Sequence, residues 1–253
     1  KKVIIFNGEI YNHLQLIKKY FNNQYWKSQS DTETLLNLII KIGPENTLKV
    51  IDGMFSFVFY SKAEDKLYFS RDQFGQKPLY YLLDKRKKKI IISSIINPLK
   101  QELKENSINL EIDDFAYSSY FYLGYIPSPM TIYKRIRSAN PGIFYEIDLK
   151  SFNLNSYKYK IEYSLNEEIS KRNIVDFQEE FWFLFKRSIL RRTNGIIKPI
   201  PLALSGGIDS SLILKAFIEL NIEFAAFFVD VGGNYSERKY IEIIANNSFI
   251  KIL

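Results

Sequence analysis

The stretch Ser205-Gly206-Gly207-Ile208-Asp209-Ser210-Ser211 indicates how the C-terminal part of this chain folds. It follows an apolar run at residues 200–204, which is typical of a buried strand, and it precedes apolar residues at helical spacing. The chain must turn sharply between strand and helix, and the two glycines permit positive φ and leave the backbone amides uncovered. Since amides at a helix N-terminus favour anions, the stretch predicts a phosphate-binding loop.

The side chains of this loop favour the same interpretation. The hydroxyl groups of Ser205, Ser210 and Ser211 add hydrogen-bond donors, and the Asp209 carboxylate suits Mg²⁺ better than it suits phosphate. The stretch is not a Walker loop, because it lacks the GxxxxGKS or GxxxxGKT pattern. The alternative is an ordinary Gly-Gly turn followed by a Ser or Asp helix cap.

The composition limits the chemistry that the chain can perform. At 253 residues and 46% hydrophobic, the chain can form two domains or one large one. It contains no cysteine, so disulfides, thiolate metal sites and cysteine nucleophiles are excluded among these residues. The single histidine, His13, opens a helical pattern and is predicted to be a solvated helix residue. No apolar run reaches the length of a membrane span and no leader is visible, so we predict a soluble, cytoplasmic protein without a membrane partner.

The net charge of +7 raises the question of nucleic-acid binding. The positive charges are spread along the chain, and the densest run, Lys85-Arg86-Lys87-Lys88-Lys89, lies between two strand-like segments, as the tip of a hairpin would. We therefore expect no nucleic-acid partner.

Two halves of the chain differ in their apolar periodicity. The first half is dominated by short strands between which helical stretches lie, and this pattern predicts stacked sheets with helices outside. The strands are expected at residues 3–6, 54–60, 67–70, 79–83, 90–93 and 143–147, and the helices at 12–21 and 32–42. From about residue 166 the pattern becomes α/β, with a helix at 175–190, strands at 200–204 and 224–229 in a parallel sheet, and a third strand beginning at 251–253. The polar residues 150–170 are the expected connector.

Polar residues at the end of the first strand form a second group of interest. Phe6-Asn7-Gly8-Glu9-Ile10-Tyr11-Asn12 is typical of a strand that ends in a turn, and Ser30-Asp31-Thr32-Glu33 is typical of a capping box. Each pattern alone has this ordinary structural explanation. Arg71 and Asp72 are interpreted as a structural pair.

These motifs together carry a family resemblance. The stretch Leu204-Ser205-Gly206-Gly207-Ile208-Asp209-Ser210-Ser211 resembles the pyrophosphate loop of the N-type ATP pyrophosphatases. With the Asn7-Gly8-Glu9 and Ser30-Asp31 motifs and residues 70–81, in order along nearly the whole chain, the sequence resembles the glutamine-hydrolysing asparagine synthetases. The resemblance implies an α+β N-terminal-nucleophile glutaminase domain, an αββα sandwich, at residues 1–150. An α/β parallel-sheet ATP pyrophosphatase domain would follow at residues 166–253.

The resemblance also implies roles for individual residues. The Asn7 side chain and the Gly8 N–H would form a catalytic oxyanion hole, and both would bind glutamine together with Glu9 and Asp31. Asp209 would bind Mg²⁺. The ATP-binding residues would be Leu204, Ser205, Gly206, Gly207, Asp209, Ser210 and Val229.

The function implied is ATP-dependent adenylation of aspartate and its amidation to asparagine, with ammonia from glutamine. The resemblance also admits a homodimer. The alternatives are a relative that amidates another carboxylate, such as a surface-polysaccharide sugar acid, and a binding protein whose glutaminase is dead. The family's nucleophilic cysteine would precede Lys1 and its catalytic lysine would follow Leu253, so we expect a chain truncated at both ends and inactive as it stands.

Overall fold

The structure, a computed structural model, describes residues 1–21, 26–159, 173–230, 232 and 237–248. The chain divides into two compact units, Lys1–Tyr163 and Ser164–Leu253. Among the described residues, no helix combines the length and the apolar character that crossing a bilayer requires.

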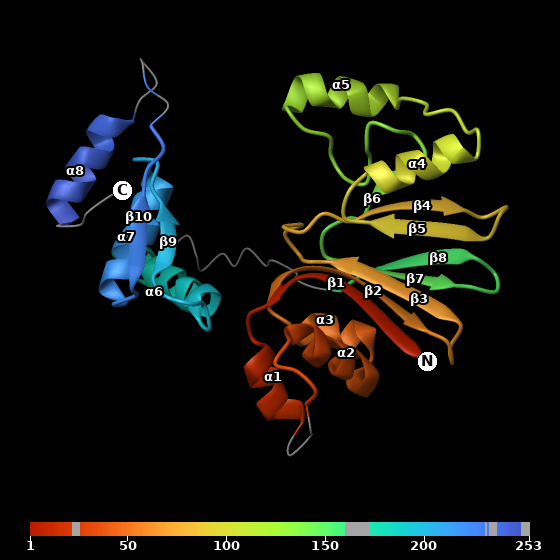
Figure 1. Cartoon of the computed structure of the whole chain (residues 1–253), viewed down its shortest axis with the longest axis horizontal. Coiled ribbons are helices and arrows are strands. Elements are labelled where there is room, and N and C mark those ends of the chain that lie inside the picture. Colours follow the sequence, from red (N-terminus) through yellow and green to blue (C-terminus); the bar gives the residue numbers. More distant parts are fainter. Residues whose placement is uncertain (22–25, 160–172, 231, 233–236, 249–253) are drawn as a thin grey trace. The chain divides into compact units, whose positions relative to one another are not determined.

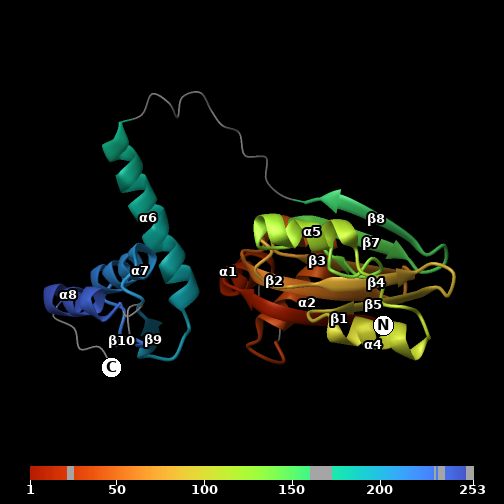
Figure 2. The same ribbon diagram turned by 90° about the horizontal axis from the view of Figure 1, so that it is seen from above.

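The first unit is built in four layers (Figures 1 and 2). One sheet has five antiparallel strands in the order β1-β2-β3-β7-β8: Lys2–Ile10, Gly53–Ser61, Lys66–Arg71, Ile143–Asp148 and Asn153–Lys158. A second sheet has the order β5-β4-β6: Lys89–Ser93, Tyr80–Asp84 and Arg137–Ser138. Three helices cover the outer face of the five-stranded sheet, namely α1 His13–Tyr20, α2 Asp31–Ile42 and α3 Pro44–Val50. Two lie outside the three-stranded sheet, α4 Asn97–Glu105 and α5 Asp114–Leu123. The predicted stacking of two sheets with helices outside is therefore confirmed.

Alternation along the strands separates the buried layers. Phe55, Phe57 and Phe59 of β2 face the helices, where Leu35 and Leu38 of α2 are fully buried. Between the sheets, the rings of Phe69 and Tyr145 stack with their centroids 4.6 Å apart, and Leu79 and Ile147 pack around them. Because both faces of the five-stranded sheet are covered at its centre, these strands are apolar on both sides, and only the outer strands expose polar residues.

The predicted turn at Asn7-Gly8-Glu9 is wrong, since all three residues lie within β1. The strand pairs with β2 without interruption from Lys2 opposite Ser61 to Ile10 opposite Gly53. Gly8 enters the ladder with a φ of +154°, which a glycine adopts without strain.

The predicted capping box is only half formed. Ser30 Oγ accepts a hydrogen bond from the Thr32 N–H at 3.2 Å and caps α2. Glu33 does not reach back to Ser30; its carboxylate accepts from the N–H groups of Lys27 at 2.9 Å and Ser28 at 2.7 Å. The hydrogen bond from Lys27 contributes most to holding the pKa of Glu33 below its ordinary value.

Residues 150–170 are not simply a connector. Their first part forms β8, which pairs with β7 from Ile143 opposite Lys158 to Asp148 opposite Asn153. The first unit therefore extends past residue 150, and residues 160–170 lie outside the described part.

Arg71 and Asp72 are structural, as expected, but they bind different partners. The Asp72 carboxylate accepts from the N–H groups of Phe74, Gln76 and Lys77, each at 3.0 Å, and from that of Phe55 at 3.3 Å. The buried Arg71 guanidinium donates to carbonyl groups, that of Ala139 at 3.2 Å and that of Gly75. The two side chains together hold the loop that leads from the five-stranded sheet to β4.

The second unit contains a parallel strand pair with helices. Its elements are α6 Ile174–Thr193, β9 Ile200–Ala203, α7 Ile208–Glu219, β10 Phe224–Phe227 and α8 Arg238–Ser248. β9 and β10 are parallel, with Phe224 opposite Ile200 and Phe227 opposite Ala203, as the periodicity predicted. Leu202, Leu214 and Phe217 are buried in its core. The third strand expected at residues 251–253 lies outside the described residues.

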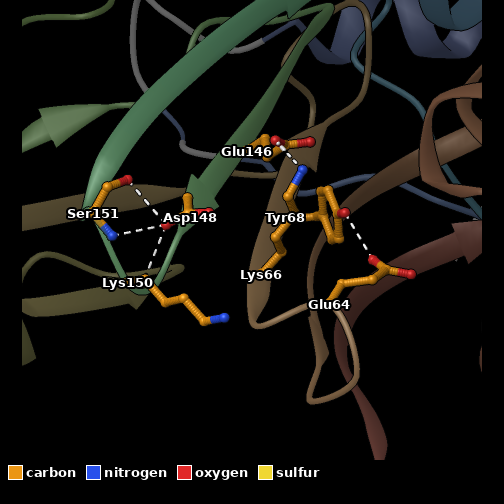
Figure 3. A network of polar contacts seen from close by, with 7 residues as sticks. All are labelled: Glu64, Lys66, Tyr68, Glu146, Asp148, Lys150 and Ser151. Carbon is orange, nitrogen blue, oxygen red and sulfur yellow. Dashed lines mark hydrogen bonds and ion pairs between the residues drawn. The ribbon is translucent and has the colours of Figure 1, made fainter.

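A network of polar contacts closes the end of the five-stranded sheet (Figure 3). Lys66 Nζ lies 2.7 Å from Glu146 Oε1 across the β3–β7 pair, and the Tyr68 hydroxyl donates to Glu64 at 2.8 Å. Asp148 accepts from the N–H groups of Lys150 and Ser151 in the turn before β8. These contacts stabilise the pairing of β3 with β7 at this end of the sheet.

The Lys66–Glu146 pair predicts a pH-dependent stability. The hydrogen bond to Glu146 raises the pKa of Lys66 above its ordinary value of 10.5, so the pair's stabilisation is fully present below that value and is lost as the pH rises through the folded-state pKa. We expect Glu146→Gln to lower the free energy of unfolding by about 0.5–1 kcal/mol at about pH 8, and by less at about pH 11.5. Urea unfolding measures this in a Trp182→Phe background, where Trp26 reports on the first unit.

The matched control is Glu105→Gln, which removes an exposed carboxylate whose hydrogen bond comes from the neutral amide of Gln101. It should show no such change with pH. An effect of Glu146→Gln that is equally large at both pH values would contradict the prediction.

Candidate functional site

The free edge of β1 presents backbone donors. In an antiparallel ladder, the N–H and C=O of one residue point to the same side, and opposed residues alternate between bonded and non-bonded pairs. Both polar groups of Phe55 face Asp72. The Phe55 N–H donates to Asp72 Oδ2 at 3.3 Å, and the Phe55 carbonyl accepts from the Asp72 N–H at 2.8 Å. Gly8 lies opposite Phe55, so this pair is non-bonded and the N–H of Gly8 points away from β2. In the described part of the chain, β1 has no neighbouring strand on that side.

Asp31 lies at the same edge. Its Oδ2 accepts from the N–H of Ile10 at 2.8 Å, and Ile10 follows Gly8 by two residues, so the two N–H groups share one side of the strand. Two residues of a strand span about 7 Å. The start of α2 thereby brings Asp31, 21 positions along the chain from Ile10, next to the end of β1.

The side chains of Asn7 and Glu9 are on the exposed face of β1. Burial alternates along the strand, with Phe6 and Ile10 toward the helices and Asn7 and Glu9 toward solvent. The structure therefore brings the four residues predicted for glutamine to one end of one strand. Their side chains and the free Gly8 N–H offer an amide, two carboxylates and a backbone donor.

Gly8 cannot carry a side chain in this position. A Cβ atom built on it would collide with the carbonyl oxygen of Met54 and would lie 2.6 Å from the Cα of Phe55. Only glycine therefore allows β1 and β2 to pair this closely while the Gly8 N–H stays at the open edge.

Asn12 is a supporting residue to which the sequence assigned no role. Its side-chain amide donates to the carbonyl of Val50 at 2.9 Å and accepts from the N–H of Asp52 at 2.9 Å. It thereby ties the start of α1 to the segment before β2. An Asn just before a helix suggests a cap, but Asn12 makes no side-chain cap, and only the fold reveals its distant partners.

The Ser205 loop of the second unit connects β9 with α7, as predicted. Gly206 has a φ of +78°, and a Cβ on it would lie 3.0 Å from Cβ of Tyr240 in α8. Hydroxyl groups shape the loop from within: the Ser205 N–H donates to Ser210 Oγ at 3.3 Å, and Ser210 Oγ donates to the Gly207 carbonyl at 3.1 Å.

The N-terminus of α7 has no side-chain cap. The N–H groups of its first turn have no partners inside the helix, so they are available to an anion. Leu204 is buried, and its N–H donates to the carbonyl of Phe227 at 3.0 Å, which fixes the loop at the C-terminal end of the strand pair. These observations fit a pyrophosphate group and disfavour the alternative of an ordinary capped turn.

Asp209 and Val229 lie where ligands of such sheets bind. Asp209 is exposed in the first turn of α7, and Val229 is 72% exposed just after β10, so both follow the carboxyl ends of neighbouring parallel strands. The described residues contain no cluster of three or more His, Cys, Asp or Glu side chains suited to a metal. Asp209 would thus be a single protein ligand, as is usual for a Mg²⁺ held between one carboxylate and phosphate oxygens.

Comparisons with known proteins agree with the first unit. Residues 1–159 match the family described as glutamine amidotransferase domain. A Methanocaldococcus jannaschii protein provisionally named glutamine-hydrolysing asparagine synthetase 2 is 30% identical over 252 residues, which are 96% of this chain and 46% of that protein. Bacillus subtilis glutamine-hydrolysing asparagine synthetase 1 is 29% identical over 233 residues, 89% of this chain and 34% of that protein. The chain thus spans less than half the length of these relatives.

Among solved structures, the chain is similar to the glutamine phosphoribosylpyrophosphate amidotransferase from B. subtilis complexed with ADP and GMP. The match covers 64% of this chain and 30% of the amidotransferase chain. Its TM-score is 0.42 and its sequence identity 17%.

The first unit has the four αββα layers that the family resemblance implied for its glutaminase domain. The chain belongs to the glutamine amidotransferase domain family. The predicted resemblance to glutamine-hydrolysing asparagine synthetases is confirmed by relatives of that name along most of the chain.

The close packing at Gly8 predicts a large loss of stability on substitution. Gly8→Ala must push β1 from β2 in addition to straining the backbone, so we expect the free energy of unfolding of the first unit to fall by at least about 3 kcal/mol. The control is Gly124→Ala, because Gly124 also has positive φ, +76°, but a Cβ there meets nothing within 4 Å. It should cost about 1 kcal/mol. Equal losses in urea unfolding, followed by Trp26 in the Trp182→Phe background, would show that the collision with Met54 does not matter.

Proposed function

We propose that this chain serves glutamine-dependent amide transfer and binds glutamine at the C-terminal end of β1. The observation that carries the proposal is the Gly8 N–H on the open edge of β1, with Asn7, Glu9 and Asp31 around it, in a member of the glutamine amidotransferase domain family. A strand edge with a free donor, an amide and two carboxylates matches the polar groups of glutamine.

Each residue takes a part of the substrate. The Asn7 side-chain amide and the Gly8 N–H donate to the oxygen of the glutamine side-chain amide and stabilise the negative charge that develops there when a nucleophile attacks. Glu9, exposed on the same strand, binds the α-ammonium group. Asp31 already holds the Ile10 N–H through Oδ2, so it offers the remaining lone pairs of its carboxylate, chiefly those on Oδ1, to the ammonium.

We propose further that the second unit binds ATP, with the pyrophosphate on the Ser205 loop. The uncapped first turn of α7 and the backbone at Gly206 and Gly207 receive the phosphate oxygens, and Ser205 and Ser210 supply hydroxyl groups. Asp209 holds the Mg²⁺, which supplies charge neutralisation on the phosphates. The Leu204 backbone and Val229 lie beside the adenine.

The names of the relatives support aspartate as the acceptor of ammonia. An aspartate carboxylate oxygen attacks the α-phosphorus of ATP and pyrophosphate leaves, which gives an aspartyl-adenylate. Ammonia from glutamine then attacks the activated carbonyl carbon, the C–O bond to AMP breaks, and the amide forms.

The glutamine proposal is tested by binding, because the 253 residues contain no cysteine. Titration calorimetry of the chain with glutamine should give saturable binding that Glu9→Gln weakens at least about tenfold, since it removes the counter-charge of the ammonium, equivalent to about 1.4 kcal/mol. Glu45→Gln, which removes an exposed carboxylate on α3, is the matched control and should leave the affinity unchanged. Equal binding by the wild-type chain and Glu9→Gln would contradict this site.

The ATP proposal has its own test. The affinity for Mg²⁺–ATP should fall at least about tenfold in Asp209→Asn. Removal of Mg²⁺ with a chelator should lower the affinity of the wild-type chain for ATP but should lower that of the variant little further. Asp176→Asn, in the exposed first turn of α6, is the control. If Asp209→Asn bound Mg²⁺–ATP like the wild-type chain, Asp209 would not be the ligand.

A further inference from the structure

A cavity of about 560 Å³ opens between the tip of the β4–β5 hairpin and α4. Its apolar lining comes from Leu82, Leu83, Leu103 and Ile108, of which Leu82 of β4 and Leu103 of α4 are buried in the core between these two elements. The volume lies in the range of small-molecule sites, about 300–1,000 Å³. The tip of this hairpin and the C-terminal end of β1 lie at opposite ends of the first unit, so the cavity is separate from the glutamine site (Figures 1 and 2).

The charged residues around the cavity are mostly basic. Five cationic side chains and two carboxylates line it, which leaves a net charge of +3 at neutral pH. The cations are those of Lys85, Arg86, Lys87, Lys89 and Arg135.

Both carboxylates of the lining are already engaged. Asp84 Oδ1 accepts from the N–H groups of Lys87 and Arg86, each at 3.0 Å. The hydrogen bond from Lys87 contributes most to lowering the pKa of Asp84, and the charge of Arg135 contributes to a smaller degree. Glu102 forms an ion pair with Lys89, with Lys89 Nζ 2.6 Å from Glu102 Oε1. Asp84 keeps its negative charge because the backbone N–H groups that it binds are neutral, and the five cations still exceed the two carboxylates by three.

Three of the five cations are held by no partner side chain among the described residues, although the charge of Arg135 acts on Asp84. Lys85, Arg86 and Arg135 make no hydrogen bond or ion pair through their side chains within the described ranges, and all three are exposed at the mouth of the cavity. Lys87 Nζ donates to the neutral Asn106 Oδ1 at 2.8 Å, which holds the side chain and leaves its charge uncompensated. Like charges gathered this way repel one another, and an anion would relieve the repulsion.

The hairpin tip is held in place from two sides. Lys87 and Lys89 bind Asn106 and Glu102 at the end of α4, and Lys88 Nζ donates to the Lys150 carbonyl in the β7–β8 turn at 2.9 Å. A tip fastened in this way keeps the backbone that carries Lys85 and Arg86 in place, which lowers the entropic cost of binding.

We propose that this cavity binds a phosphorylated small molecule. Its phosphate group lies among Arg86, Arg135 and Lys85, where the guanidinium groups match phosphate oxygens in pairs, and its apolar body lies on Leu83 and Ile108, the apolar lining residues that are not buried. The lining residues that the structure describes form a concave, leucine-rich space and include no aromatic ring for base stacking, which favours a small ligand over a nucleic-acid strand.

The test uses the whole chain with labelled Leu and Ile methyl groups and 1-naphthyl phosphate as the probe. Titration followed by methyl NMR should give saturable shifts at Leu82, Leu83, Leu103 and Ile108, with an affinity at least about tenfold above that of inorganic phosphate or of 1-naphthol. The double variant Arg86→Gln/Arg135→Gln should lose at least about tenfold in affinity, whereas Arg86→Lys/Arg135→Lys should retain part of it because the charge remains.

The charge-matched control is Lys18→Gln/Lys62→Gln, which removes two exposed cations elsewhere and should leave the affinity within about twofold. Unchanged glutamine binding by the Arg86/Arg135 variant shows that the first unit is folded and separates this proposal from the proposed function. The proposal is overturned if 1-naphthol binds as tightly as 1-naphthyl phosphate. It is also overturned if Arg86→Gln/Arg135→Gln binds 1-naphthyl phosphate with the wild-type affinity. Tighter binding of a single-stranded RNA oligonucleotide through the same arginines would overturn it in favour of a nucleic-acid surface.

Discussion

The buried carboxylate of Asp72 is the contact on which the arrangement of the first unit depends. It gathers three N–H groups of the loop that follows β3 and, in addition, the N–H of Phe55 in β2. The Phe55 carbonyl in turn accepts from the Asp72 N–H, so both polar groups of Phe55 are directed toward Asp72 and none toward β1. Gly8, opposite Phe55, is left with its N–H on the open edge. A structural carboxylate thereby determines which backbone donor the candidate glutamine site receives. Removing a buried charged acceptor of this kind would cost several kcal/mol, because its donors would lose their partners.

The two candidate sites share one physical principle, although one lies on a strand and the other at a helix. Each relies on backbone N–H groups that the secondary structure leaves unpaired: the Gly8 N–H at a strand edge and the first-turn N–H groups of α7. Such donors are held rigidly by the elements that carry them, so they need little reorganisation when negative charge appears. Glycine is required at both places, since Gly8 packs against the backbone of β2 and Gly206 has positive φ next to α8.

Local patterns predicted most elements correctly. The apolar-aromatic run at residues 54–60 and the helical spacing at residues 32–42 correspond to β2 and α2, and the Ser205 loop lies between a strand and a helix as expected. The errors came where a hydrogen-bonding partner outside the motif outweighs the local preference. Asn7-Gly8-Glu9 has the composition of a turn, but nine consecutive pairings with β2 make it a strand. Glu33 has the position of a capping-box acid, but the N–H groups of Lys27 and Ser28 come closer. The polar residues 153–158 look like linker, yet β7 supplies them with an edge to pair with.

Local sequence patterns were enough to specify the kind of most elements and the type of residue at each candidate site. Periodicity and glycine positions are local properties, and they depend on the chain's own sterics and on which side chains avoid water. The tertiary structure alone decided which polar groups meet: Asp31 with the Ile10 N–H, Asn12 with the segment before β2, and Asp72 with Phe55. It also gathered the hairpin cations around an apolar cavity, which the run Lys85–Lys89 did not reveal. These contacts depend on strand register and layer packing between residues far apart in the chain, and hydrogen bonds of this reach leave no periodic signal in the sequence.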